Sequence, residues 1–408
     1  MRAMPIVLMG LAVCLVLGEA QAQQPGRSRA VERAKKALAE PFVGITTDGR
    51  VRTGLFTRKK TGLSTLVVRQ AAEAVLRGLS EAQRKRTLFP VDHSEWRDWA
   101  NIHRFPRQGV SLAELGESQR QLVYALLSAS LSARGYDTSR NIMRLNGHLA
   151  ELVQNIKEYG EHLYWLTMMG EPSATEPWGW QIEGHHLAVN FFVLGDQVVM
   201  TPTFMGSEPV EALSGRYKGI AVLQVEQDLG LKLMTSLPPE QQRLAYSGER
   251  TGQAAMLAAM FSDNIIVPFK GVRASQLSPA HRAALLELVG RYVGMMPDDH
   301  AALKMVEVQM HLDETYFSWM GGTEANAAFY YRIHSPVILI EFDHQGPIAL
   351  PGDRSVPTRR HIHTVVRTPN GNDYGRDLLR QHLLEAHRGQ PHHVHPQSGQ
   401  PHRHPHRH

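Results

Sequence analysis

The chain has 408 residues, with 44 Lys or Arg, 39 Asp or Glu and a formal net charge of +5 at pH 7. Three of the arginines lie in residues 388–408, which contain no acidic residue, so the rest of the chain is close to neutral. No block of Lys and Arg is interleaved with aromatic residues, which argues against a nucleic-acid-binding protein.

Residues 1–22 have the pattern of a secretory signal peptide. Arg2 precedes an apolar run over residues 6–17, and a small-x-small cleavage motif follows at residues 20–22. The run is too short to span a bilayer and no later segment approaches eighteen apolar residues, so we expect no membrane anchor. We therefore expect a periplasmic or extracellular protein. The single cysteine, Cys14, lies in the signal peptide, so the mature chain would have no disulfide and no thiol ligand.

The mature chain is long enough for one large domain with a substantial core. We predict a single domain over residues 23–387. Helical periodicity dominates before each of two strand-rich blocks, at residues 178–204 and 328–345. Strands that are grouped in blocks, rather than alternating singly with helices, indicate an α+β fold.

The two strand-rich blocks resemble each other. Each follows helices, opens with paired aromatic residues and leads to a Val-Val-x-Thr-Pro segment. This predicts an antiparallel sheet built from two similar hairpin blocks packed against helices, with a cleft between halves at residues 60–225 and 230–387. An internal duplication explains the similarity; the alternative is that hairpins after helices simply look alike.

Residues 388–408 form a His-rich, low-complexity tail that contains seven His and four Pro. A segment with almost no large apolar residue cannot form a core, so we predict that the tail is disordered. Its imidazoles are suited to binding Zn, Cu or Ni. The alternative is a solubilising extension that becomes cationic below about pH 6.5.

The sequence HIHTVVR, residues 361–367, predicts a β-strand. Residues two apart on a strand point to the same face, so His361 and His363 lie side by side and Arg367 continues that face. Two imidazoles on a rigid element suit Zn, Cu or Fe. The same spacing also occurs on solvated strand faces and in cross-strand hydrogen-bonding pairs.

The sequence WQIEGHHLAVN, residues 180–190, holds a second polar group. If it is one continuous strand, Glu183 and His185 share a face and His186 lies on the other. Gly184 is unfavourable inside a strand and often marks a bulge. A bulge at this position would turn both histidines toward one cavity.

These patterns combine into one candidate site between the halves. His361, His363 and one of His185 and His186 would hold a divalent transition metal. Glu183 would be a general base or a further ligand, and Arg367 would hold a carboxylate or oxyanion of a small-molecule substrate.

The candidate site leaves three functions open. We favour a metal-dependent hydrolase with zinc, while copper or iron would make it a redox enzyme. A non-catalytic protein that binds a metal or small ligand is the second possibility. A metal-free enzyme that uses His186 or His363 as acid or base beside Glu183 is the third.

The segments PWGWQIEGHHLAVN, FYYRIHSPVILIEFD, HIHTVVR and NDYGRDLLRQH resemble the secreted bacterial family known as domain of unknown function 3500. The resemblance extends over about residues 30–388, and the loop at residues 346–358 and the His-rich tail depart from the family's pattern. It implies that the family's polar residues form one site, and it implies no particular reaction. The positions that match the family are Glu183, His185, His186, His361, His363, Arg367, Tyr374, Asp377 and Leu378.

Overall fold

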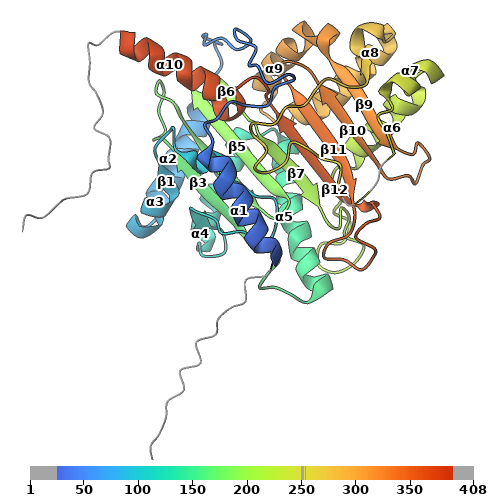
Figure 1. Cartoon of the computed structure of the whole chain (residues 1–408). Coiled ribbons are helices and arrows are strands. Elements are labelled where there is room, and N and C mark those ends of the chain that lie inside the picture. The colour runs from blue at the N-terminus through green and yellow to red at the C-terminus, as the bar shows by residue number, and fades with distance from the viewer. Residues whose placement is uncertain (1–24, 250–251, 253, 389–408) are drawn as a thin grey trace, which may run out of the picture.

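Figure 1 shows the computed structural model, which describes residues 25–249, 252 and 254–388. The predicted signal peptide and residues 389–408 of the predicted tail lie outside the described residues. In the described part of the chain, no helix is long and apolar enough to cross a membrane.

The helices lie in two groups along the chain, with one helix at each end of the described residues. They are α1 (Pro25–Ala39), α2 (Leu66–Gly78), α3 (Glu81–Thr87), α4 (Glu117–Ser130), α5 (Ala133–Val153), α6 (Gln224–Ser236), α7 (Pro239–Ala245), α8 (Pro279–Val293), α9 (Asp298–Met310) and α10 (Arg376–Arg388). Short 3-10 turns are η1 (Ser94–Arg97), η2 (Ala274–Gln276), η3 (Leu312–Glu314) and η4 (Asp373–Gly375). Ser80, Ser132 and Ser278 each accept a hydrogen bond from the N–H three residues on, which fixes the starts of α3, α5 and α8.

The strands form one mostly antiparallel sheet. They are β1 (Leu88–Phe89), β2 (Val110–Ser111), β3 (Tyr164–Met169), β4 (Trp178–Gly184), β5 (Leu187–Leu194), β6 (Gln197–Val199), β7 (Thr203–Ser207), β8 (Val272–Arg273), β9 (Tyr316–Gly321), β10 (Phe329–His334), β11 (Leu339–Gln345) and β12 (Thr358–Arg367). Their order across the sheet is β1-β3-β4-β5-β7-β12-β11-β10-β9-β8. The predicted α+β fold and the pairing of both hairpin blocks into one antiparallel sheet are confirmed.

The element order repeats in the two halves. In the first, α2 and α3 precede β2, α4 and α5 follow, and β3, β4, β5 and β7 complete the unit. In the second, α6, α7, β8, α8, α9 and β9 to β12 appear in the same order, and β2 and β8 each pair antiparallel with the strand after the helices. The two units meet where β7 pairs antiparallel with β12, at the centre of the sheet.

The two faces of the sheet have different chemistry. One face is apolar and packs in the main core, where Trp178, Trp180 and Ile182 of β4 are completely buried. On β4 the other face carries Gln181 and Glu183, because successive strand residues alternate between faces. This second face is also buried. It lies under η1 and the residues that follow it, from which Trp96 O and Ala100 N–H bond to these two side chains.

Candidate metal centre

His185 and His186 form the turn between β4 and β5. Gly184 pairs with Leu187, so these two histidines alone close the hairpin. The prediction of one continuous bulged strand was therefore wrong. His186 has a φ of 65°, a left-handed conformation that costs roughly 1 kcal/mol or more in a residue with a side chain. The turn was hard to foresee because Asn-Gly and related pairs, not His-His, signal two-residue hairpin loops.

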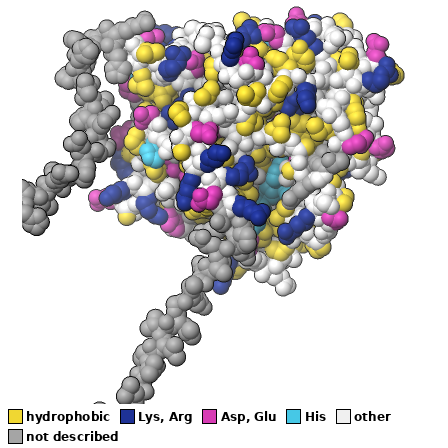
Figure 2. Space-filling view, viewed as in Figure 1, with side chains coloured by type: hydrophobic (Ala, Val, Ile, Leu, Met, Phe, Trp, Pro, Cys, Tyr) yellow, Lys and Arg dark blue, Asp and Glu magenta, His cyan; other side chains and the backbone are white. Residues whose placement is uncertain are grey.

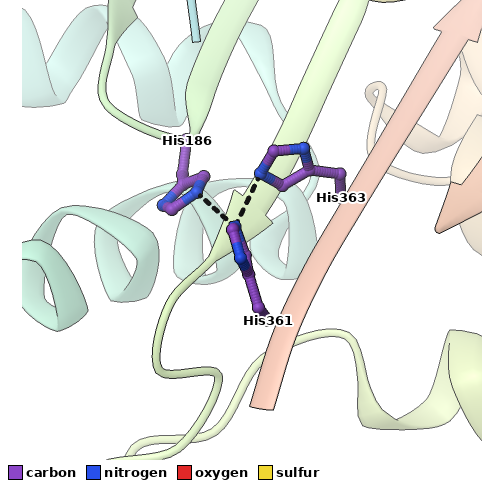
Figure 3. Close-up of side chains that lie close together, drawn as sticks. All are labelled: His186, His361 and His363. Atoms are coloured by element: carbon purple, nitrogen blue, oxygen red, sulfur yellow. Dashed lines mark hydrogen bonds between the residues drawn. The ribbon is translucent and has the colours of Figure 1, made fainter. Parts of the chain in front are cut away.

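This turn brings His186 against β12 (Figure 3). His361 and His363 lie on one face of that strand, as predicted. The Nε2 atom of His361 is 3.1 Å from Nε2 of His186 and 2.9 Å from Nε2 of His363. We call these three residues the histidine cluster. All three are buried, and their ligand atoms lie within 4.8 Å of one another.

The geometry of the histidine cluster fits a metal ion. Two ligands at 2.0–2.1 Å from a tetrahedral zinc ion lie about 3.3–3.4 Å apart, so the separations of His361 from His186 and from His363 are within a few tenths of an ångström of that value, and the third separation is within 4.8 Å. Nδ1 of His361 donates to the carbonyl oxygen of Gly346 at 2.8 Å, which leaves a lone pair on Nε2. The Nε2 lone pair of His361 faces Nε2 of both His186 and His363, so a proton on one of these rings or a shared cation can lie between the three atoms. Among the described residues, no other set of three His, Cys, Asp or Glu converges so closely.

Burial keeps the histidine cluster neutral. Loss of hydration lowers the pKa of His361, and it lowers the pKa values of His186 and His363 well below the usual range. Glu208 acts in the opposite direction on His361, but burial is the larger effect. Neutral imidazole is the form that binds metals, so the three rings are in the ligating state at pH 7.

Two further groups hold the histidine cluster in place, and neither was predicted from the sequence. Glu208 accepts the N–H groups of residues 348, 349 and 350 at 2.9, 3.0 and 3.1 Å, and so fixes the loop that carries Gly346. Gly206 lies opposite His363 in the β7–β12 pair, and a Cβ there would lie 2.6 Å from Ile362 O and 3.0 Å from His363 Cδ2. Only a glycine lets the His363 ring lie against β7.

His185 lies beside the histidine cluster and is not part of it. Its ring stacks on His186 with centroids 3.9 Å apart. Its Nδ1 atom is 2.8 Å from Oδ1 of Asn146, whose amide nitrogen donates to Gly160 O at 2.9 Å. This orientation of the Asn146 amide makes His185 Nδ1 the donor and leaves an acceptor lone pair on Nε2. Of the two candidates for the third ligand, the structure brings His186 to the cluster.

Glu183 supports the site from a distance. Its Oε2 atom accepts Ala100 N–H at 2.7 Å and lies 3.2 Å from Nε of Arg107. Burial raises the pKa of Glu183 to about 7, although Arg107 opposes the shift. The residue after Ala100 is Asn101, whose carbonyl oxygen accepts the N–H of His186 at 3.1 Å. Glu183 therefore helps to position the His185–His186 turn rather than lining the cluster.

Arg367 forms its hydrogen bonds in a different part of the fold. Its guanidinium group is completely buried and donates to Ala258 O, Ala259 O, Asp263 and Asp373. Asp263 also accepts the hydroxyl of Tyr374, another of the residues that match the resembled family. The structure does not bring Arg367 to the histidine cluster, and we do not retain it as a substrate anchor.

A family model described as "Protein of unknown function (DUF3500)" matches residues 61–376. The chain belongs to the DUF3500 family. The matched range includes both structural units, the histidine cluster, Gly206 and Glu208. No curated protein and no solved structure shows a significant match to the chain.

Proposed function

We propose that this DUF3500 protein is a metal-dependent hydrolase of a small molecule, with zinc held by His186, His361 and His363. One observation carries the proposal, namely the convergence of three buried Nε2 atoms at 3.1 and 2.9 Å. Three protein ligands are typical of catalytic zinc, which keeps one position open. Zinc in such a site polarises a carbonyl or phosphoryl oxygen of the substrate.

The residues of this chain would prepare the site for that chemistry. His361 is held in one tautomer by Gly346 O, and the Glu208 carboxylate fixes the loop that supplies this carbonyl. The three rings are buried, and electrostatic interactions are stronger in a site that holds little water.

Three nitrogen ligands also suit copper or iron, which would give a redox enzyme instead. A non-catalytic metal-binding protein is a further candidate, favoured by the near-complete burial of the three ligands. From the signal-peptide pattern of residues 1–22 we also infer a periplasmic or extracellular location, where the His-rich tail would bind Zn, Cu or Ni independently.

The first test is metal content, measured by plasma mass spectrometry on tag-free protein that starts at Gln23 and ends at Arg388. Removal of the tail excludes its own metal binding. We expect about one bound metal per chain. A His361→Ala/His363→Ala variant should lose the metal and remain folded. His334→Ala is the matched control, because His334 is buried on the same sheet face and lies outside the cluster.

The second measurement is turnover of p-nitrophenyl acetate and p-nitrophenyl phosphate by the zinc-loaded protein. Hydrolysis that is lost with the metal supports the hydrolase. Tight metal binding with no turnover of any ester, amide or phosphate supports the non-catalytic alternative. A protein that takes up neither Zn, Cu nor Fe after reconstitution would contradict the metal site altogether.

A further inference from the structure

A cavity of about 530 Å³ opens beside His185, and we call it the side cavity. Its volume is in the range of small-molecule binding sites. The residues that matter most for its chemistry are His103, Arg104, Lys157, Glu158, Trp165 and His185. Because the His185 ring stacks on His186, the side cavity lies one imidazole ring away from the histidine cluster.

The side cavity carries a surplus of positive charge. Glu158 is its only carboxylate, and this group already accepts hydrogen bonds from Arg104 and from Asn155 at 2.8 Å, with Nε2 of His103 at 2.6 Å. Lys157 is exposed, and among the described residues no carboxylate lies within ion-pair distance of its ammonium group. One cation is therefore available to a ligand, while the single anion is fully engaged.

The surroundings of the histidine cluster also favour an anion. The cluster consists of neutral imidazoles, and the nearest carboxylate, Glu208, is held by three backbone N–H groups and lies 3.9 Å from Nδ1 of His361. A divalent metal at the cluster would keep its positive charge uncompensated by any ligand. Figure 2 shows histidine side chains at the base of a hollow, with Lys and Arg side chains around it.

His185, which lines the side cavity, is held in one tautomer. His185 is 6% exposed, and its Nδ1 proton is committed to Asn146. Its Nε2 atom therefore carries a lone pair that can accept a hydrogen bond. The indole of Trp165 forms an aromatic wall of the side cavity.

We propose that the side cavity binds the oxyanion group, a carboxylate or a phosphate, of the small molecule on which the histidine cluster acts. Lys157 supplies the attracting charge and Arg104, held in place by Glu158, flanks it. The proposal rests on the proposed function for the substrate's role, but the anion site itself consists only of protein groups.

The test is calorimetric titration of the tail-free, zinc-loaded protein with sodium acetate and with inorganic phosphate as probes. We expect Lys157→Glu to weaken binding of the preferred anion by about tenfold, because reversal of one nearby charge changes the interaction on that scale. Lys232→Glu, which reverses an exposed charge on α6, should have no effect. Binding should also weaken as ionic strength rises. Whichever of acetate and phosphate binds more tightly identifies the oxyanion group of the ligand as a carboxylate or a phosphate.

Failure of this proposal and failure of the proposed function give different results. If the protein holds a metal but Lys157→Glu binds both anions as the wild type does, or if the wild type binds neither, the side cavity is not the anion site. A different result is that the protein takes up no metal but still binds one anion, and that Lys157→Glu loses this anion binding. The anion site in the side cavity is then supported, and the metal-dependent reaction is contradicted.

Discussion

The carboxylate of Glu208 lies 3.9 Å from Nδ1 of His361, and the same carboxylate holds the loop whose Gly346 carbonyl accepts that nitrogen's proton. Glu208 and His361 are far apart in sequence, and Glu208 orients the His361 ring through the backbone of the loop that contains Gly346. Groups that orient metal-binding histidines in this way typically contribute 10- to 100-fold to metal affinity.

We therefore expect Glu208→Gln to lower zinc affinity by about 10- to 100-fold in a competition assay with a chelating dye. The amide cannot accept three backbone N–H groups as a carboxylate does, so the loop loosens and His361 loses its fixed tautomer. Asp353→Asn is the control, because Asp353 lies on the same loop and is exposed, and among the described residues its carboxylate accepts hydrogen bonds from Ser355 alone. Equal zinc affinity in Glu208→Gln and wild type would show that His361 needs no such support.

Gly206 gives a second test of the geometry. A Cβ at this position would contact Ile362 O at 2.6 Å, and because that atom belongs to the backbone it cannot move aside easily. We expect Gly206→Ala to lower the free energy of unfolding by about 1–3 kcal/mol and to weaken zinc binding by displacing His363. Gly290→Ala is the control, since a Cβ at Gly290, inside α8, meets no atom within 4 Å. Urea unfolding and dye competition should both be unchanged or improved in the control.

The sequence predicted the parts of this site that depend on local periodicity. The alternation in HIHTVVR placed His361 and His363 on one face of a strand, and the similar blocks implied one sheet with the site between them. The turn at His185–His186 escaped prediction because its left-handed residue is a histidine rather than Gly or Asn. Glu208 escaped because its role depends on a loop about 140 residues further along the chain, which only the tertiary structure brings to it.

Arg367 was predicted to act at the site from strand alternation, which is a local pattern. Strand alternation correctly placed it on the face of His361 and His363, but alternation says nothing about what covers each position. The segment that contains Ala258, Ala259 and Asp263 covers this end of β12, far along the strand from the cluster. Because these acceptors engage its guanidinium group, Arg367 contributes to the structure here and does not face the cluster.

Glu95 predicts an unusual pH dependence of stability in the metal-free protein. Burial, reinforced by Glu183 and Asp98, raises the pKa of Glu95 from 4.5 to about 9. Because the folded-state pKa is raised, the unfolded chain releases this proton first, near pH 4.5. The contribution of Glu95 is therefore fully present below pH 4.5 and is lost progressively as the pH rises toward 9.

Glu95→Gln removes this proton release and keeps the shape of the side chain. We expect the variant and the wild type to unfold at similar urea concentrations at pH 4, and the variant to be more stable by about 2–4 kcal/mol at pH 8. Glu81→Gln is the control, because Glu81 is an exposed glutamate on α3. A constant difference between Glu95→Gln and wild type from pH 4 to pH 8 would contradict a raised pKa at Glu95.

Variants of Arg367 distinguish a structural role of this residue from a role in the candidate site. Its guanidinium lies 2.8 Å from Asp263 and 3.2 Å from Asp373, and removal of the cation would leave two buried carboxylates with one fewer partner each. We expect Arg367→Ala to lower the free energy of unfolding by about 3–5 kcal/mol in urea. Arg367→Lys should also destabilise the protein, because an ammonium group cannot donate to four acceptors in the planar arrangement of a guanidinium. Protein of either variant that remains folded should bind zinc and acetate or phosphate with wild-type affinity. A variant of normal stability with weakened anion binding would restore Arg367 as a substrate anchor.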